Sequence, residues 1–508
     1  MPTEVAIDNP ILNGAFEEPK RHFKFTDDGI TNEVVEQRRT SSYFVPIAKS
    51  KKSSKQLSIA FEELQRDRVE ENKLVNQLRE KVGRWRSGGY AGVTSTTRRL
   101  LNYWTNKSRE NRLFFCQIEA METTIYITEV AKKYGEPWVD KALRDANDSS
   151  NPGLPRTALK MATGTGKTVV MAMLIAWQSL NKLARPQDAR FSDCFIIIAP
   201  GITIRDRLRV LLPHDPDNYY RQRDIVPNEL MESLGQSKIV IINFHAFLPR
   251  DLTDASRLAK SILQQGSLES AFIETGDQLV KRVCREFGQK KNIIVINDEA
   301  HHCYRRKPEA QEDLRGEEKK EAEENNEEAK IWISGIEAIK RKIGVKAIYD
   351  LSATPFFLNG SGWPEGSLFP WVVSDFSLID AIESGVVKVP RVPVSDNSMR
   401  GEQPTYRDLW LRIRDDLPKR SRRKEEFVGE PKLPAELQGA IHSLYENYKV
   451  AYDRHMRDGD AAVAGRTPPV FIVVCNNTNV SKLVYDYISG WEKPLPGGTS
   501  RNVSMTLR

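Results

Sequence analysis

The chain has 508 residues, of which 39% are hydrophobic and 29% charged, and a formal net charge of +7. A length prior of about 150 residues per domain predicts roughly three domains of ordinary globular composition. There is no run of about 18 or more apolar residues, and Met1 to Pro10 lacks a signal-peptide pattern, so we expect neither a membrane span nor a secretory leader.

Charge and cysteine use narrow the class of protein further. The net positive charge is compatible with a polyanionic binding partner but does not establish one. The five cysteines are scattered and form no C-x-x-C pair, which argues against a disulfide framework and against a structural zinc site. We therefore expect a cytoplasmic protein in a reducing compartment.

Residues 1–112 are predicted to be a mainly helical accessory region. Apolar residues recur at helical spacing from Leu57 to Leu64 and from Leu74 to Val82, and a short helix is expected over Thr97–Trp104. Arginines alternate here with aromatic residues: Arg84, Trp85, Arg86, Tyr90, Arg98, Arg99, Tyr103 and Trp104. This pattern is typical of nucleic-acid contact faces. It also fits amphipathic helices packed on the next domain, and we favour the packed-helix interpretation.

Residues 113–358 are predicted to be an α/β domain with a doubly wound parallel sheet. Short apolar runs alternate with helical stretches, as in βα units. The predicted strands are Thr157–Lys160, Phe195–Ile198, Lys238–Ile242, Ile293–Ile296 and Lys346–Leu351. Nearly continuous apolar runs indicate strands buried on both faces, and ligands of such sheets bind beyond the carboxyl ends of the strands.

The remaining segments are less regular. Glu309–Lys330 is crowded with Glu and Lys, which predicts a solvated helix or a mobile insertion. Residues 359–465 are expected to be a linker or insertion, and their basic run Lys419–Lys424 fits either a phosphate-backbone contact or a plain solvated surface. In residues 466–508, an apolar run at Val470–Val474 and a helical stretch from about Val480 to Trp491 predict the beginning of a second α/β lobe.

Met161–Thr168 is predicted to bind phosphate. It lies between a strand-like segment and a helix, and that context supports a P-loop assignment. The loop residues are Thr163, Gly164, Thr165, Gly166, Lys167 and Thr168. The glycines allow backbone N–H groups to turn toward a phosphate, and the start of the helix adds partial positive charge. Lys167 would reach the β and γ phosphates of ATP, and the Thr168 hydroxyl would bind Mg²⁺, although Met161 replaces the usual first glycine.

Ile293–His302 predicts a buried strand that presents two carboxylates at its end. Phosphoryl transfer needs a positioned metal, charge stabilisation and an oriented water. Asp298 suits a direct or outer-sphere role on Mg²⁺, and Glu299 suits the general base that polarises the attacking water. His301 is expected to couple this site to its neighbours. We reject a metal site at His302 and Cys303, because the sequence shows no second ligand pair.

With these motifs in view, the chain resembles superfamily 2 helicases and translocases of the DEAH type, and most of all the restriction (Res) subunit of type III restriction enzymes. Residues 113–358 would then be a RecA-like P-loop NTPase lobe. Met161–Thr168 resembles motif I and Asp298–His301 motif II. In Leu351–Pro355, which resembles motif III, Ser352 and Thr354 would couple hydrolysis to movement. Phe115–Ala120 resembles the adenine-reading Q motif, in which Gln117 would read the base.

The resemblance also implies nucleic-acid contacts and partners. Ile198–Leu208 and Ile242–Phe247 are similar to segments that touch the DNA backbone. The residues implied are Pro200, Gly201, Arg205, Arg207, Asn243 and His245. In the family, a second RecA-like lobe supplies an arginine finger, and a nuclease follows. We find neither the arginine-finger motif nor a nuclease motif, so we expect a fragment or the first product of a split gene, and the sequence leaves open whether another chain supplies the rest of the second lobe and the nuclease.

The expected function is therefore an ATP-dependent and Mg²⁺-dependent translocase on double-stranded DNA in a restriction-modification system, with a methyltransferase or specificity subunit as a possible partner. Three alternatives stay open: a stand-alone repair helicase, an RNA-directed motor, and a fragment that binds ATP without turnover. An adjacent methyltransferase gene, the response to DNA against RNA, and the presence of turnover would separate them.

Overall fold

The computed structural model describes residues 7, 9–26, 29–45, 68–250, 274–307, 314, 316–389, 409–418, 432–459, 467–494 and 500–503. The predicted helix at Leu57–Leu64 and the basic run at 419–424 lie outside these residues. The chain divides into two compact units, Met1–Val389 and Pro390–Arg508. In the described part of the chain, no helix is long and apolar enough to cross a membrane.

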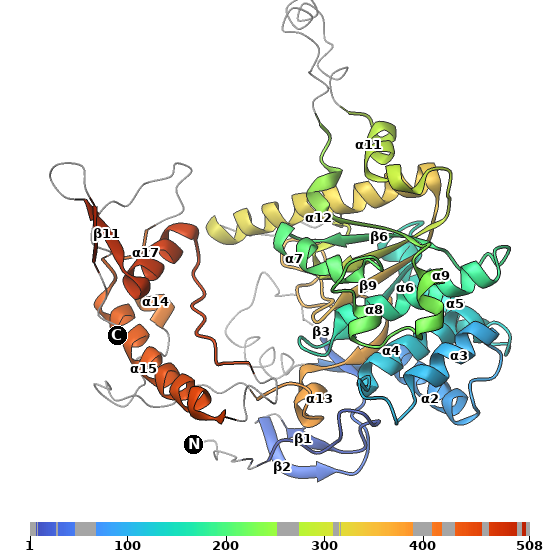
Figure 1. Cartoon of the computed structure of the whole chain (residues 1–508), viewed down its shortest axis with the longest axis horizontal. Helices are drawn as coiled ribbons and strands as arrows, with labels where there is room; N and C mark the ends of the chain where they lie inside the picture. The colour runs from blue at the N-terminus through green and yellow to red at the C-terminus, as the bar shows by residue number, and fades with distance from the viewer. Residues whose placement is uncertain are drawn as a thin grey trace, which may run out of the picture. The chain divides into compact units, whose positions relative to one another are not determined.

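A six-stranded parallel sheet forms the centre of the first unit (Figure 1). Its order is β10-β5-β9-β8-β6-β7. The strands are β5 (Arg156–Met161), β6 (Cys194–Ala199), β7 (Lys238–Asn243), β8 (Ile293–Asp298), β9 (Val345–Ser352) and β10 (Val372–Phe376). The predicted α/β class and the five predicted strands are confirmed. The carboxyl ends of parallel neighbours meet at one edge, and that edge brings the sequence motifs together.

Alternate residues of the strands enter two different cores. Phe195 and Ile197 of β6 pack with the helices of one face. Those helices are α2 (Lys73–Ser87), α3 (Ser95–Trp104), α4 (Phe115–Ile125) and α6 (Lys167–Ala184). Ile196 and Ile198 of the same strand pack on the other face, with α11 (Gly276–Val283) and α12 (Gly316–Ile343). The sheet is thus the middle layer of three, and helices pack on both of its faces.

Shorter helices and turns surround the sheet and its two layers of helices. The remaining helices and turns of the first unit are η1 (Tyr126–Val130), α5 (Pro137–Ser150), α7 (Ile202–Arg207), η2 (Leu208–Leu211), α8 (Tyr219–Gln222), η3 (Asn228–Leu230), α9 (Met231–Leu234), η4 (Phe244–Phe247), η6 (Arg285–Phe287), η7 (Ala300–His302) and α13 (Leu378–Glu383). The acidic segment predicted as a solvated helix is the first half of α12, whose second half is buried at Trp332 and Ile336. One long helix is therefore solvated at its start and part of the core at its end.

The leading region combines helices with two antiparallel strand pairs. β1 (His22–Thr26) pairs with β2 (Gly29–Val35), and β3 (Ser42–Val45) pairs with β4 (Arg68–Glu71). The predicted helices from Leu74 and over Thr97–Trp104 are confirmed as α2 and α3. Trp85 and Trp104 are buried, and Arg86 binds the buried carboxylate of Glu122. The structure therefore supports the packed-helix interpretation for these residues.

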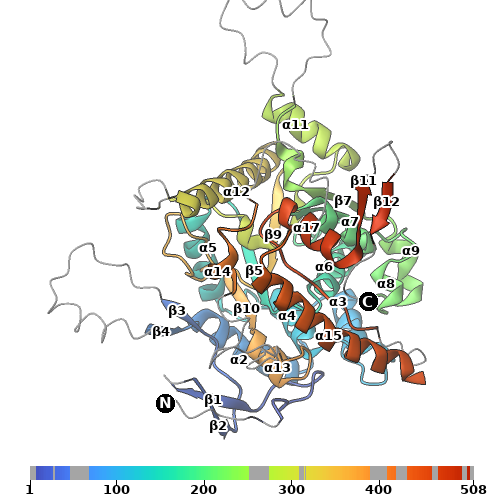
Figure 2. The same ribbon diagram turned by 90° about the vertical axis from the view of Figure 1, so that its left-hand side faces the viewer.

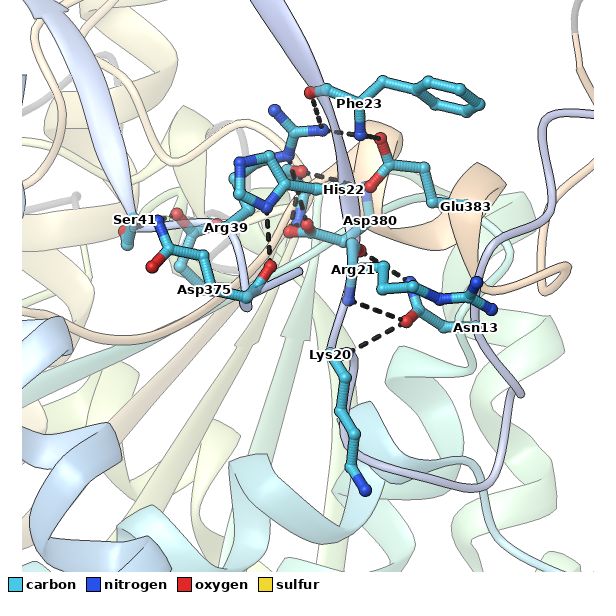
Figure 3. Close-up of polar contacts among 12 residues, drawn as sticks. Asn13, Lys20, Arg21, His22, Phe23, Arg39, Ser41, Asp375, Asp380 and Glu383 are labelled. Carbon is cyan, nitrogen blue, oxygen red and sulfur yellow. Dashed lines mark hydrogen bonds and ion pairs between the residues drawn. The ribbon is translucent and has the colours of Figure 1, made fainter. Parts of the chain in front are cut away.

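Glu383 at the end of α13 holds the leading segment on the first unit (Figure 3). Its carboxylate accepts the Phe23 N–H at 3.1 Å and pairs with Arg39 at 2.5 Å. Its carbonyl accepts the N–H groups of Leu12 and Asn13. In both whole-chain views, the β1–β2 hairpin lies beside α13 (Figures 1 and 2). The hairpin is therefore an integral part of the unit that carries the sheet.

β10 extends the sheet beyond residue 358, where the sequence analysis placed a linker. It pairs with β5, and Asp375 within it forms an ion pair with Lys160 at 2.9 Å. The run Val-Val-Ser-Asp-Phe is not continuously apolar, so its pattern did not indicate a buried strand. The first unit accordingly continues to Val389.

The second unit contains α14 (Leu409–Ile413), α15 (Ala435–Arg457), α17 (Thr478–Ser489) and the antiparallel pair β11 (Trp491–Pro494) and β12 (Ser500–Val503). α17 confirms the helical stretch predicted near Val480. The strand predicted at Val470–Val474 is wrong, because these residues form no strand and Val474 is 91% exposed. Apolar β-branched residues favour a strand where a neighbouring strand pairs with them, and in the described part of this unit these residues pair with none, although the Phe471 ring packs on Tyr445 and Tyr448 of α15.

Candidate nucleotide site

The phosphate loop lies between β5 and α6, as the motif predicts. Gly164 and Gly166 have φ values of +87° and +86°, a conformation that residues with a Cβ rarely adopt. Gly166 immediately precedes α6, whose first residue is Lys167. The first turn of a helix leaves its N–H groups unpaired and carries partial positive charge. The loop and the helix start together form a cradle for an anion.

Gln117 fastens this loop to α4. Its Nε2 donates to the carbonyl of Thr165 at 2.9 Å, and its Oε1 accepts the N–H of Phe114 at 3.0 Å. The Gln117 residue is only 4% exposed. A Cβ on Gly166 would overlap the Gln117 amide nitrogen. The structure therefore places the predicted base reader against the loop, with both ends of its amide bonded to backbone.

A cavity of about 300 Å³ opens beside the loop. Gly164, Gly166 and Thr168 line it on the side of the phosphates. Gln117 also lines it, together with residues that the sequence analysis missed: Asn111, Arg112, Phe114, Tyr219 and Arg223. The Arg223 guanidinium lies 5.5 Å from the centre of the Tyr219 ring, so the wall offers both flat and cationic surfaces. Tyr219 and Arg223 come from about 100 residues further along the chain, where no motif marked them.

Motif II lies across the loop from this cavity. β8 ends at Asp298, which is buried, and Glu299 follows with φ 48° and ψ 51° in the left-handed region. For a residue with a Cβ this conformation is strained, and such strain is often found at functional sites. Glu299 Oε1 lies 3.2 Å from Lys167 Nζ. The predicted lysine and the predicted base thus face each other across the position expected for the γ-phosphate.

The carboxyl group of Asp298 has a raised pKa. Burial, and then the neighbouring Glu299 carboxylate, raise its pKa to about 6 against the opposing effect of Lys167. Its carboxylate and the hydroxyl of Thr168 are hard oxygen donors of the kind that Mg²⁺ binds through few protein ligands. These two residues fit the metal predicted from the sequence, which would neutralise charge on the phosphates.

His301 connects motif II with motif III. Its Nδ1 lies 2.9 Å from the Ser352 Oγ and 3.6 Å from Glu299 Oε2. The Ser352 Oγ also accepts the N–H of Thr354 at 3.0 Å. Burial lowers the pKa of His301 to about 4, so the ring is neutral at pH 7. The three residues predicted to couple the site therefore form one connected group.

A buried polar network lies beneath both motifs and was not predicted. The side chains of Arg156 and Asp350 are fully buried and paired, with Arg156 Nε 2.7 Å from Asp350 Oδ2. Asp350 also accepts Trp371 Nε1–H at 2.8 Å and Asn297 Nδ2–H at 2.7 Å. Asn297 directly precedes Asp298, and Asp350 lies two residues before Ser352. The network therefore fixes the strand ends that present the site.

The predicted nucleic-acid residues gather at the neighbouring part of the same edge. β6 and β7 pair in register up to Ala199 and Asn243, so Pro200 and Gly201 adjoin Asn243. His245 stacks on Phe244 with ring centres 4.1 Å apart. Arg205 is paired with its neighbour Asp206 at 2.6 Å. A phosphate at Arg205 would therefore compete with a carboxylate, whereas no ion pair holds Arg207 within the described residues.

The raised pKa of Asp298 predicts a pH-dependent metal affinity. Only the ionised carboxylate binds Mg²⁺, and a pKa of about 6 leaves about a quarter of it ionised at pH 5.5 and nearly all at pH 7.5. We expect the Mg²⁺ concentration for half-maximal ATP binding to rise about fourfold on lowering the pH from 7.5 to 5.5. Titration calorimetry at both pH values tests this. An Asp298→Asn control should show no such change, and a constant Mg²⁺ requirement in the native chain would contradict the assignment.

The comparisons with known proteins agree with this geometry. Residues 112–357 match the family described as type III restriction enzyme, res subunit. A search of curated protein sequences finds no match. The matched range includes the phosphate loop, motif II and motif III, and it ends before β10. Residues 112–357 are therefore a domain of the type III restriction enzyme res subunit family, a nucleotide-binding module of the superfamily 2 helicase type.

Proposed function

We propose that the chain is an ATP-dependent DNA translocase or helicase module of a restriction-modification system, and that it hydrolyses ATP with Mg²⁺ on duplex DNA. The observation that carries the proposal is the juxtaposition of three motifs at one sheet edge. Lys167 lies 3.2 Å from Glu299, and His301 lies 2.9 Å from Ser352. The family match supports the ATPase and helicase class of this module.

In this proposal the phosphates of ATP lie in the loop 163–168. Backbone N–H groups and Lys167 hold the β and γ phosphates, because a helix start and a cation together stabilise the growing negative charge. Thr168 and Asp298 would hold Mg²⁺ against the same phosphates. Glu299 orients the attacking water and accepts its proton, which is the general-base role. When ATP enters, Lys167 exchanges its contact with Glu299 for the phosphates.

Coupling to movement would run through motif III. The neutral His301 ring hydrogen-bonds Ser352, and Ser352 in turn holds the backbone at Thr354. A change at Glu299 during hydrolysis can therefore reach the end of β9 through His301, which lies 3.6 Å from the Glu299 carboxylate and hydrogen-bonds Ser352. Strand ends that carry both nucleotide and nucleic-acid contacts would transmit this change along the sheet edge.

Duplex DNA would cross the ends of β6 and β7, over residues 200–207 and 243–247. Contacts there would be to phosphates, so binding would be independent of sequence and sensitive to salt. From the resemblance, we propose a methyltransferase or specificity subunit as a further partner. A repair helicase or an RNA motor would share the same nucleotide site.

DNA binding by an Arg207→Ala variant tests the location of the DNA path. The affinity for a labelled duplex should fall, and the slope of log affinity against log salt should decrease by about 1, as for a lost phosphate contact. Arg285→Ala is the matched control, because Arg285 precedes β8 and its neighbour Glu286 contacts Lys238 at the amino end of β7. Equal losses in both variants, or tighter binding of RNA than of DNA, would contradict the proposal.

A further inference from the structure

We propose that the first unit has a second anion site, at the amino ends of β5 and β9, which binds a small phosphorylated ligand of nucleotide size. A cavity of about 610 Å³ lies there. β5 and β9 are parallel neighbours, so their amino ends lie at the sheet edge opposite the three motifs. The cavity shares no lining residue with the one beside the phosphate loop. The second site is therefore separate from the proposed nucleotide site and goes beyond the proposed function.

Cations without a carboxylate partner gather around this cavity. Four of them come from four different segments: Lys132 after η1, Arg144 of α5, Lys340 of α12 and Lys346 of β9. Within the described residues, no ion pair holds any of these four side chains. Arg156 and Arg190 also line the cavity, but each already has a carboxylate partner at 2.7 Å. The fold therefore brings four unneutralised positive charges to one place.

Two carboxylates reduce this charge without cancelling it. Asp140 and Asp148 of α5 line the cavity as well, and neither forms an ion pair in the part of the chain that the structure describes. Four cations against two carboxylates leave an excess of two positive charges. A cleft lined by one sign of charge concentrates the electric field and attracts counter-ions. A phosphate group supplies nearly two negative charges in a compact form, so it matches this excess.

The cationic side chains are held in place for such a ligand. Gly153, in the loop between α5 and β5, has φ +77°, and a Cβ there would lie 3.2 Å from Lys340 Nζ. The Lys340 ammonium therefore packs closely on that loop. Arg144 Nε donates to the Asp140 carbonyl at 3.3 Å, which orients the guanidinium. An ammonium binds phosphate as a point charge, and a guanidinium can bind two phosphate oxygens at once.

The size and the apolar part of the wall indicate what else the ligand carries. Ile127, Leu143 and Leu154 also line the cavity, and the last two are buried. Pockets for small molecules have volumes of about 300–1,000 Å³ and combine apolar walls with a few polar groups. Duplex DNA is a convex rod, so it could present only single backbone phosphates to the opening. A small ligand with a phosphate group and a less polar part fits the whole cavity.

Pyrophosphate binding by a chain with a disabled phosphate loop tests this site. Titration calorimetry without Mg²⁺ on the full chain carrying Lys167→Ala should show one bound pyrophosphate. Adding Lys340→Ala and Lys346→Ala should weaken binding by at least about tenfold, as for a lost charge-assisted contact. Lys320→Ala is the matched control, because Lys320 is an exposed lysine of α12 outside the cavity and should leave the affinity unchanged. Thermal unfolding checks that each variant is folded, and bound pyrophosphate should raise the melting temperature.

Three results would overturn the second site. The Lys167→Ala chain could fail to bind pyrophosphate, or the two added substitutions could leave its affinity unchanged. They could also weaken the binding of duplex DNA and not of pyrophosphate, which would assign these lysines to a DNA contact. Lys132→Ala, at an exposed position of the same wall, should also weaken pyrophosphate and keeps the test decisive if the other variant does not fold. Since the phosphate loop is already disabled, none of these results bears on ATP hydrolysis by the native chain.

Discussion

A Glu299→Gln variant is expected to lose ATP hydrolysis by about 10²–10⁴-fold while it still binds ATP, because the amide cannot accept a proton from the attacking water. Substitution by glutamine preserves the size of the side chain and the left-handed backbone at this position. Lys167 Nζ lies 3.2 Å from the Glu299 carboxylate. Removing that charge frees Lys167 for the phosphates, so we expect ATP affinity to be equal or higher.

Single-turnover hydrolysis and equilibrium binding, measured on the same preparation, separate these two effects. Glu327→Gln on the exposed part of α12 is a suitable control, because it removes one carboxylate far from the loop in sequence and should leave both quantities unchanged. Hydrolysis by Glu299→Gln at a rate near that of the native chain would show that another group activates the water. Loss of ATP binding would show that Glu299 supports the fold of the site instead.

An Asp350→Ala variant is expected to lose about 3–5 kcal/mol of stability, because it leaves the Arg156 guanidinium buried without its partner. The same substitution removes the acceptor for Trp371 and Asn297. For a unit that spans Met1–Val389, we expect the melting temperature to fall by roughly 4–6 °C. Since Asn297 adjoins Asp298, the affinity for Mg-ATP should also fall in whatever fraction remains folded.

Thermal unfolding of a second variant, in which both charged side chains of the pair are replaced, shows whether the unpaired charge causes the loss of stability. Replacing both residues, as Arg156→Met with Asp350→Leu, removes the unpaired charge and should recover part of the lost stability. Lys24→Ala, which breaks the exposed pair with Glu33 at 2.8 Å, should change the melting temperature little. An Asp350→Ala variant as stable as the native chain, or a double variant less stable than the single one, would contradict the account.

The parts of the fold that the sequence predicted are those with a local signal. β6 and β8 are continuous apolar runs, and the phosphate loop follows a strand and begins a helix, so neighbouring residues determine both. The meeting of motifs I, II and III at the sheet edge followed from parallel pairing alone, because each of them ends or follows a strand. His301 and Ser352, predicted as coupling residues, contact each other across 51 positions of sequence.

The rest depended on contacts between distant residues. Arg156 and Asp350 are 194 positions apart, and a charge within a strand gives no sign in the sequence that its partner is buried beside it. Tyr219 and Arg223 reach the cavity from the first residue of α8 and from the residue after it, and this four-residue helix has no sequence pattern. β10 has a serine and an aspartate at its centre, and Asp375 is buried because Lys160 and Ser41 contact it. In each of these cases, contacts between residues distant in sequence determined the structure, and the local sequence pattern did not.

The central claim is that this chain is a DNA-dependent ATPase whose phosphate loop centres on Lys167. Steady-state ATP hydrolysis by the full 508-residue chain, with and without duplex DNA and alongside Lys167→Ala, tests it most directly. We expect the native chain to hydrolyse ATP at a rate that duplex DNA stimulates, and Lys167→Ala to show no hydrolysis. Hydrolysis that survives in Lys167→Ala, or a native chain that binds ATP but does not hydrolyse it with duplex DNA present, would contradict it.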